Sequence, residues 1–225
     1  MEDIGVYIHI PFCMSKCYYC DFISFSKLDN GIDKYISHLI EEMGLYKEIL
    51  RNYRIKTIFI GGGTPSYIEG RYIYRLLNHV YKNFNVDNLE EITIEANPGT
   101  LDREKLNIYK KSGINRISMG LQSLNDRLLK EIGRVHTSMD FYRNYEIIKN
   151  MGFKNINVDL MFGLPNQNLE DVLKTLGKVA DLGVGHLSYY SLILEEGTPM
   201  FRWYKEGRIN IPNEEIEREM YHKGV

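Results

Sequence analysis

The sequence has no long apolar run, no excess of one charge and few cysteines, and each lack argues against a class of protein. Its 225 residues include no run of about 18 apolar residues, which a membrane-spanning helix requires. The net charge of −2 argues against bulk binding of nucleic acid or anionic lipid. The start, MEDIGVYIHIPFC, has neither the basic segment nor the cleavage site of a secretion signal. We therefore expect a cytoplasmic protein with no nucleic-acid partner and no membrane span.

The sequence also has no low-complexity segment and no linker rich in proline, glycine and serine. Instead, short β-branched runs alternate with longer helical patterns. The short runs predict strands at 5–10, 56–61, 91–96, 115–120, 155–162 and 186–192. The longer patterns predict helices at 31–52, 69–83, 101–112, 137–151 and 168–183. This alternation predicts an α/β fold with a parallel sheet, either doubly wound or barrel-like.

The predicted strands are apolar on one face only. In the first strand Val6 and Ile8 share one face while Tyr7 and His9 share the other, and later strands alternate likewise. A parallel strand covered on both faces is apolar nearly throughout, and an ordinary eight-stranded barrel fills its interior with Val, Ile and Leu. The pattern therefore predicts a partial (open) parallel β/α barrel of about six βα units, whose polar inner face is a site.

Polar residues gather where three predicted strands end. Glu95 precedes ANPGT, Asp159 precedes LMFGLP, and GGGT closes the second strand. Ligand sites of parallel α/β folds form at the carboxyl ends of the strands. We therefore expect the site at this end of the barrel.

The last residues form a separate expectation. Pro212 and Asn213 precede a short helical pattern with acidic residues in its first turn. A closed eight-fold barrel needs two further units, so either the barrel is open or the chain is a fragment. We assign 1–210 to the partial barrel and 211–225 to the start of a truncated C-terminal region.

All three cysteines, Cys13, Cys17 and Cys20, lie within the segment CMSKCYYCDF. A disulfide leaves one thiol over, and the expected compartment argues against it. Zinc usually takes four ligands, with His9 as a candidate fourth. An iron–sulfur cluster held by three thiolates leaves one iron open for a small molecule. The spacing of the cysteines alone does not distinguish a zinc site from an iron–sulfur cluster.

Six motifs, in order along the chain, resemble the radical S-adenosylmethionine (SAM) superfamily in its branch similar to oxygen-independent coproporphyrinogen III oxidase. They are YIHIPFCMSKCYYCDF, FIGGGTPS, IEANPGT, GLQSLND, GRVHT and DLMFGLP. The resemblance implies that Cys13, Cys17 and Cys20 hold a [4Fe–4S] cluster whose open iron binds SAM. It also implies SAM contacts at Tyr7, Gly62, Gly63, Thr64, Glu95, Gln122, Arg134, Asp159 and Ser191.

Several of these features have an ordinary structural reading. GGGT alone is typical of a tight turn, and Glu95, Asp159 and Arg134 are residue types that usually face solvent. The motif order and the polar strand faces favour the site for Glu95 and Asp159. For His136 we expect a buried imidazole bonded to the backbone. For the aromatic residues of the cysteine segment we expect packing: Phe12, Tyr18, Tyr19 and Phe22.

Within the superfamily, the chain resembles the HemW heme chaperones more than the oxidases. The oxidases carry a further cysteine at the position of Phe22 and a longer N-terminal arm, so coproporphyrinogen decarboxylation is disfavoured. HemW proteins extend beyond 225 residues, and their heme motif is not matched here, since Trp203 stands without its histidine. The resemblance implies SAM and heme or porphyrin as ligands, with a flavodoxin or ferredoxin electron donor and a heme-accepting protein as partners. A decarboxylating oxidase and a zinc-stabilised binding module stay as alternatives.

Overall fold

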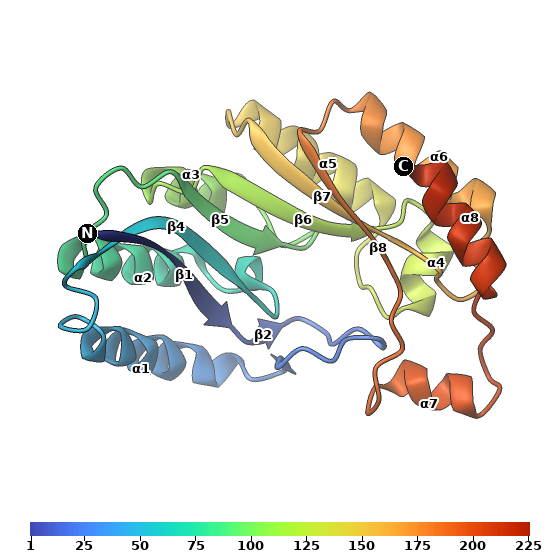
Figure 1. The fold of residues 1–225 in the computed structure, drawn as a ribbon, viewed down its shortest axis with the longest axis horizontal. Helices are drawn as coiled ribbons and strands as arrows, with labels where there is room; N and C mark the ends of the chain where they lie inside the picture. Colours follow the sequence, from blue (N-terminus) through green and yellow to red (C-terminus); the bar gives the residue numbers. More distant parts are fainter.

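The computed structural model describes all residues, 1–225, and contains one six-stranded sheet with helices along its convex side (Figure 1). The strands are β1 (Glu2–Ile10), β4 (Tyr53–Gly62), β5 (Glu91–Ala96), β6 (Arg116–Gln122), β7 (Asn155–Phe162) and β8 (His186–Ser191). They are parallel and follow one another in sequence order across the sheet. This confirms the six predicted strands and the open barrel.

Helices connect consecutive strands. They are α1 (Ile32–Leu45), α2 (Gly70–Asn83), α3 (Arg103–Lys111), α4 (Asp126–Glu131), α5 (Ser138–Asn150) and α6 (Leu169–Asp181), with α7 (Pro199–Lys205) and α8 (Glu214–Gly224) after β8. The helix predicted at 31–52 ends at Leu45. The short helices α4 and α7 were not predicted because they have too few turns for a recognisable apolar period.

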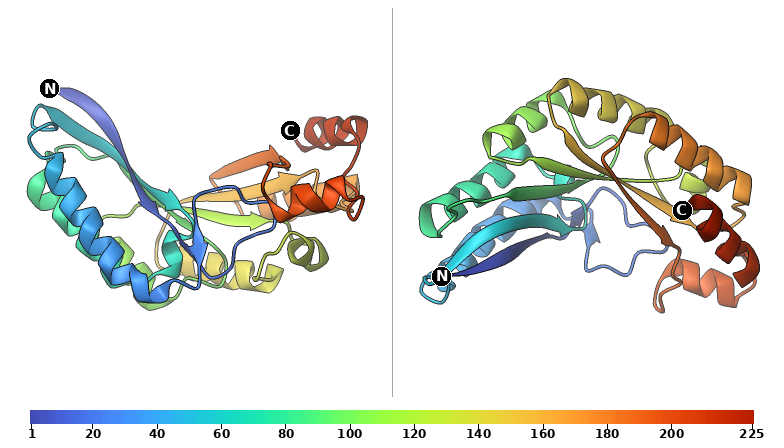
Figure 2. Two further views of the ribbon diagram at one scale, coloured as in Figure 1. Left: turned by 90° about the horizontal axis from the view of Figure 1, so that it is seen from below. Right: turned by 45° about the horizontal axis from the view of Figure 1, so that its top comes forward.

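The hydrophobic core lies between the sheet and these helices. The isoleucines of the strands that face the helices, such as Ile8, Ile60, Ile94 and Ile117, are at most 2% exposed. The other face of the sheet is concave and carries the polar members of each strand, so the arch has a dry outer side and a polar inner side (Figure 2). The structure therefore confirms the one-sided strand pattern.

A second, smaller sheet carries the loop that contains the three cysteines. It pairs β2 (Phe12–Cys13) with β3 (Phe25–Ser26), and the cysteine loop runs between the two strands. The helix α8 packs through the buried Met220 against Phe162 and Val172. The domain boundary near residue 210 stays a prediction. None of the helices combines the length and the apolar character needed to cross a membrane.

Candidate functional site: a cavity behind the cysteine loop

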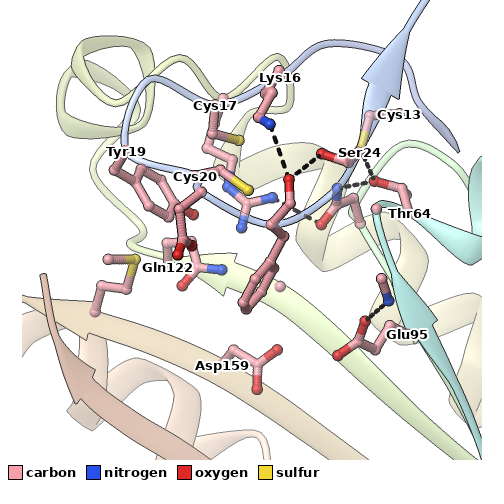
Figure 3. A pocket seen from close by; sticks show the side chains of 18 of the residues that line it. Cys13, Lys16, Cys17, Tyr19, Cys20, Ser24, Thr64, Glu95, Gln122 and Asp159 are labelled. Carbon is pink, nitrogen blue, oxygen red and sulfur yellow. Dashed lines mark hydrogen bonds between the residues drawn. The ribbon is translucent and has the colours of Figure 1, made fainter. Parts of the chain in front are cut away.

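The three cysteines lie along one loop with their thiols unpaired. Cys13 is buried in β2, whereas Cys17 and Cys20 are partly exposed. The loop is closed on itself, since the Cys20 amide donates to the Cys17 carbonyl at 3.2 Å and Lys16 Nζ donates to the Phe22 carbonyl at 2.9 Å (Figure 3). All three cysteines therefore face the same cavity from one side.

The GGGT segment holds the base of this loop from the end of β4. The Thr64 amide donates to the Phe12 carbonyl at 2.8 Å, and the Thr64 hydroxyl lies 3.5 Å from Cys13 Sγ. A Cβ on Gly63 would lie 2.9 Å from both Cys13 Sγ and the Phe12 carbonyl oxygen. Gly62 has φ +118°, a backbone conformation that side chains other than glycine rarely adopt. The glycines are thus required by the close approach of two backbones.

His9 also secures the loop. Its Nε2 lies 2.9 Å from the Ile23 carbonyl, which can only accept, so Nε2 carries the proton. Its Nδ1 then accepts from the Tyr7 hydroxyl at 3.0 Å. With both ring nitrogens engaged, His9 has no lone pair free for a metal, which argues against its role as a fourth zinc ligand.

The cavity behind the loop has a volume of about 390 Å³, within the range of small-molecule sites. It lies at the carboxyl ends of the strands, as predicted. Of the residues predicted to contact SAM, eight line it: Gly62, Gly63, Thr64, Glu95, Gln122, Arg134, Asp159 and Ser191.

Tyr7 does not line the cavity. Its ring stacks on Phe59 and is 57% exposed on the concave face. It lies beside the cavity wall, because a Cβ on Gly61 would sit 3.1 Å from the Tyr7 ring and 2.9 Å from Glu95 Oε2. Its predicted contact with SAM stays a prediction.

Two carboxylates form the sheet side of the cavity, facing the loop (Figure 3). Burial, with a smaller contribution from the charge of Asp159, raises the pKa of Glu95 to about 7, despite a 3.1 Å hydrogen bond from the Gly62 amide. Burial also raises the pKa of Asp159, which accepts hydrogen bonds from Asn157 and Ser118. The two are therefore poised to bind a donor-rich ligand, since a nearby positive group favours their charged forms.

Arg134 supplies the positive charge of the cavity. Burial lowers its pKa, but Tyr19 and Cys17 raise it by more, so the guanidinium stays charged. Its Nη1 donates to Asn97 Oδ1 at 2.8 Å, while its buried Nε has no partner. A buried unpaired donor is costly, so this group fits a site whose ligand supplies an acceptor.

Gln122 owes its position to an irregularity in β6. The pairing of β6 with β7 shifts register between Gly120 and Gln122, and Gln122 has φ +69°. This bulge turns its amide into the cavity, where Oε1 accepts from the Tyr190 hydroxyl at 3.0 Å.

Asn97 and Tyr190 are among the lining residues that were not predicted. Asn97 lies in the quoted motif IEANPGT, so its strand-end position was a usable signal. Tyr190 alternates with Tyr189 in β8, and nothing in the sequence distinguishes which of the two faces inward.

The purely structural roles predicted for His136, Phe12 and Tyr18 are confirmed. His136 is 6% exposed, its Nε2 lies 3.2 Å from the Leu121 carbonyl, and burial lowers its pKa to about 4. Phe12 packs edge-on against Tyr35, and Tyr18 against Trp203. Tyr19 and Phe22, which were expected only to pack, instead line the cavity.

The donor set fits an iron–sulfur cluster better than a single zinc ion. No three Cys, His, Asp or Glu side chains are grouped closely enough to hold one metal ion. Thiolates on one zinc lie roughly 4 Å apart, because each Zn–S bond is about 2.3 Å. Thiolates on a cluster bind different irons and need not meet at one point. Three separate thiols on a loop beside a cavity match the second arrangement.

Comparison with known proteins decides the family. Residues 7–179 match the family model described as the radical SAM superfamily. The chain belongs to the radical SAM superfamily. Its motifs and open barrel are therefore those of a radical SAM domain. Membership in this superfamily implies that the domain binds a [4Fe–4S] cluster and SAM.

The chain is also similar to individual proteins of this superfamily, in sequence and in structure. The chain is 42% identical to the heme chaperone HemW of Lactococcus lactis, with 96% of this chain and 56% of the relative aligned. It is 40% identical to HemW of Bacillus subtilis, covering 96% and 58%. Among solved structures, coproporphyrinogen III oxidase (HemN) of Escherichia coli, a radical SAM enzyme, superposes with a TM-score of 0.87 at 26% identity, covering 99% of this chain and 51% of that one. The chain spans about half the length of these relatives.

Proposed function

We propose that this chain is the SAM- and cluster-binding part of a heme chaperone, a protein that binds heme and transfers it to an acceptor. Three free thiols on one loop, beside a cavity lined by Arg134 with its buried Nε unpartnered, carry the radical SAM part of the proposal. The chaperone part is supported by HemW relatives at 40–42% identity over 96% of the chain.

Cys13, Cys17 and Cys20 would hold the cluster, which when bound supplies an electron for cleavage of SAM. The backbone of Gly62 and Gly63 admits a ligand closely because no side chain intervenes. The residues of this chain bind and orient SAM and exclude water.

The polar side chains would divide the recognition of SAM among them. Arg134 would pair with its carboxylate through charge-assisted bonds, and Glu95 and Asp159 would accept from its ammonium or hydroxyl groups. Thr64, Gln122 and Ser191 line the same cavity and complete the contacts. Tyr7, beside the cavity wall, would add a contact from β1.

A decarboxylating oxidase is the second candidate, favoured by the likeness to coproporphyrinogen III oxidase at a TM-score of 0.87. Against it stands Phe22, which occupies the place of the extra cysteine expected in that branch and lines the cavity. In either case the chain would act in the cytoplasm with a flavodoxin or ferredoxin as electron donor. A chaperone also requires a heme-accepting protein.

Anaerobic reconstitution with iron and sulfide tests the proposal first. We expect visible and EPR spectra of a [4Fe–4S] cluster that change when SAM is added, and loss of the cluster in Cys17→Ser. Met14→Ser, an exposed change in the same loop, should keep the cluster. Tight binding of one zinc with no cluster would instead support the zinc-stabilised module.

Heme chemistry is tested next on the reconstituted chain. A heme titration followed by transfer to an apo-hemoprotein should show binding and release for a chaperone. Conversion of coproporphyrinogen III to protoporphyrinogen IX would support the oxidase instead. If the chain binds SAM but neither binds heme nor decarboxylates, the chaperone proposal fails for this part of the protein.

A further inference from the structure

A layer of hydrogen-bonded polar side chains lies on the concave face beneath the cavity. Its centre is Asn157 of β7, which is 1% exposed. Asn157 Nδ2 lies 2.7 Å from Asp159 Oδ1, 2.8 Å from Ser118 Oγ and 3.0 Å from Ser188 Oγ. The carboxylate of the cavity thus rests on a buried amide.

His186 bonds the oxygen of the same amide. His186 Nδ1 lies 2.5 Å from Asn157 Oδ1. Arg116 Nη2 also lies 3.4 Å from this nitrogen, but a guanidinium only donates, so Nδ1 cannot serve both. The Asp159 carboxylate only accepts, so the amide nitrogen faces Asp159 and the amide oxygen faces His186. Nδ1 therefore carries a proton that it donates to Asn157 Oδ1, and this bond holds the amide in that orientation.

The consequence for Asp159 is a fixed orientation. Oδ1 is occupied by the amide, while Oδ2 receives only a 3.5 Å contact from Ser118 Oγ. Oδ2 is therefore the oxygen left for a donor from the cavity. Without the amide, a carboxylate this deeply placed would favour its neutral form, which is a poorer acceptor.

We propose that Asn157, oriented by His186, is the positioning residue that keeps Asp159 an acceptor for a hydroxyl- or ammonium-bearing ligand such as the nucleoside of SAM. The proposal deepens the proposed function and rests on it for the ligand. The hydrogen-bond geometry beneath Asp159 stands independently of it.

The decisive variant is Asn157→Asp, which keeps the shape and replaces the donating amide with a second carboxylate. We expect SAM to bind the cluster-reconstituted variant about tenfold more weakly at pH 8, because two adjacent carboxylates repel. At pH 6 the two carboxylates share a proton, which restores a hydrogen bond between them. The variant should then bind SAM only about threefold more weakly than the wild type. Anaerobic calorimetry measures both affinities.

Other charged and titratable groups near Asp159 also bear on the pH profile, so the comparison is made against a matched control. They are Glu95 of β5, Arg116 of β6, Arg134 after α4, and His186 and Tyr190 of β8. The control is Asn155→Asp, the same change two residues earlier on the same strand face, exposed and near Glu91 rather than Asp159. It should bind SAM as the wild type does at both pH values.

His186→Ala removes the orienting contact while leaving Asn157, Ser118 and Ser188 unchanged, and His186 itself is exposed. It should weaken SAM binding about threefold while the cluster spectrum stays unchanged. Unchanged SAM affinity in both Asn157→Asp and His186→Ala overturns the proposal, as does a loss in Asn157→Asp that is equal at pH 6 and pH 8.

A measurement without ligand separates this proposal from the proposed function. The unfolding midpoint of Asn157→Asp, relative to Asn155→Asp, should rise as the pH falls from 8 to 6. If the wild type fails to bind SAM but this shift appears, the proposed function fails and the positioning of Asp159 stands. If SAM binds and the shift is absent, the positioning proposal alone fails.

Discussion

Gly63 illustrates how a single missing side chain shapes the site. The end of β4 passes so close to the cysteine loop that an added Cβ would lie 2.9 Å from Cys13 Sγ. Real Cβ atoms essentially never approach another atom so closely, and here the nearest neighbours include backbone, which cannot move aside. The loop and the strand end are therefore one unit.

We predict that Gly63→Ala lowers the cluster content of the reconstituted chain by at least about half, because Cys13 must shift to make room. Iron and sulfide analysis with the visible spectrum measures this. Gly177→Ala is the control, since Gly177 lies in α6 with nothing near its Cβ position. It should keep the cluster and stabilise the fold by up to about 1 kcal/mol. Full cluster content in Gly63→Ala would contradict the prediction.

Glu95 is held in the cavity at a cost in stability. Its folded-state pKa of about 7 exceeds the ordinary 4.5, so the folded chain binds the proton more tightly than the unfolded chain. The associated stability is fully present below about pH 4.5 and is lost as the pH rises through 7.

We therefore predict that Glu95→Gln is more stable than the wild type at pH 8 by on the order of 2–3 kcal/mol, since the uncharged amide avoids burying a charge. The gain should shrink towards zero near pH 4.5. Urea unfolding of both proteins across this range measures it. A pH-independent difference would show that ionisation of Glu95 is not its cause.

At the scale of elements, the segment carrying Arg134 leads into α5. Thr137 caps this helix, and its side chain and that of Asp140 bond reciprocally to each other's backbone amides. The same kind of capping box, Asn168 with Asp171, begins α6. Such boxes satisfy the free amides at a helix start and set the angle at which the preceding loop enters.

We predict that Thr137→Ala lowers the free energy of unfolding by about 1 kcal/mol, because the cap is lost. Chemical denaturation measures the change. Ser138→Ala, one residue further on, removes a hydroxyl that makes no hydrogen bond in the structure and should change stability little. Equal effects of the two substitutions would argue that the capping box contributes nothing.

At the scale of the whole molecule, the cavity joins distant parts of the chain. Its wall is built from the cysteine loop, β4, β5, β6, β7, β8 and the residues after β8. These strands belong to the arch that Figure 2 shows. The sheet is open along its concave side and makes no closed ring of strands. A ligand in the cavity would therefore link the cysteine loop to strands β4 to β8.

We predict that SAM stabilises the cluster-loaded chain against unfolding. At free SAM one hundred times the dissociation constant, the gain is about 2.7 kcal/mol, which raises the melting temperature by roughly 5–10 °C for a chain of this size. Anaerobic calorimetry measures the shift. Cys17→Ser, which should lack the cluster, serves as the control and should show a much smaller shift.

The sequence by itself determined the order of strands and helices and the side of each strand that faces the core. The reason is that a strand's alternation and a helix's period are local, as in Val6–Ile8 against Tyr7–His9. It also placed Glu95, Asp159 and GGGT at strand ends, where a parallel sheet brings them together. The radical SAM domain followed from motifs whose residues sit at those ends.

Only the tertiary structure decided how these residues meet. The two hydrogen bonds of His9, the bulge that turns Gln122 inward, and the exclusion of Tyr7 from the cavity wall depend on contacts between separate elements. Asn157 and His186 lie 29 residues apart, and their hydrogen bond exists because β7 and β8 pair in one register. Alternation along a strand predicts the face of a side chain. The neighbour it meets on that face is set by strand register, which is a property of the whole sheet.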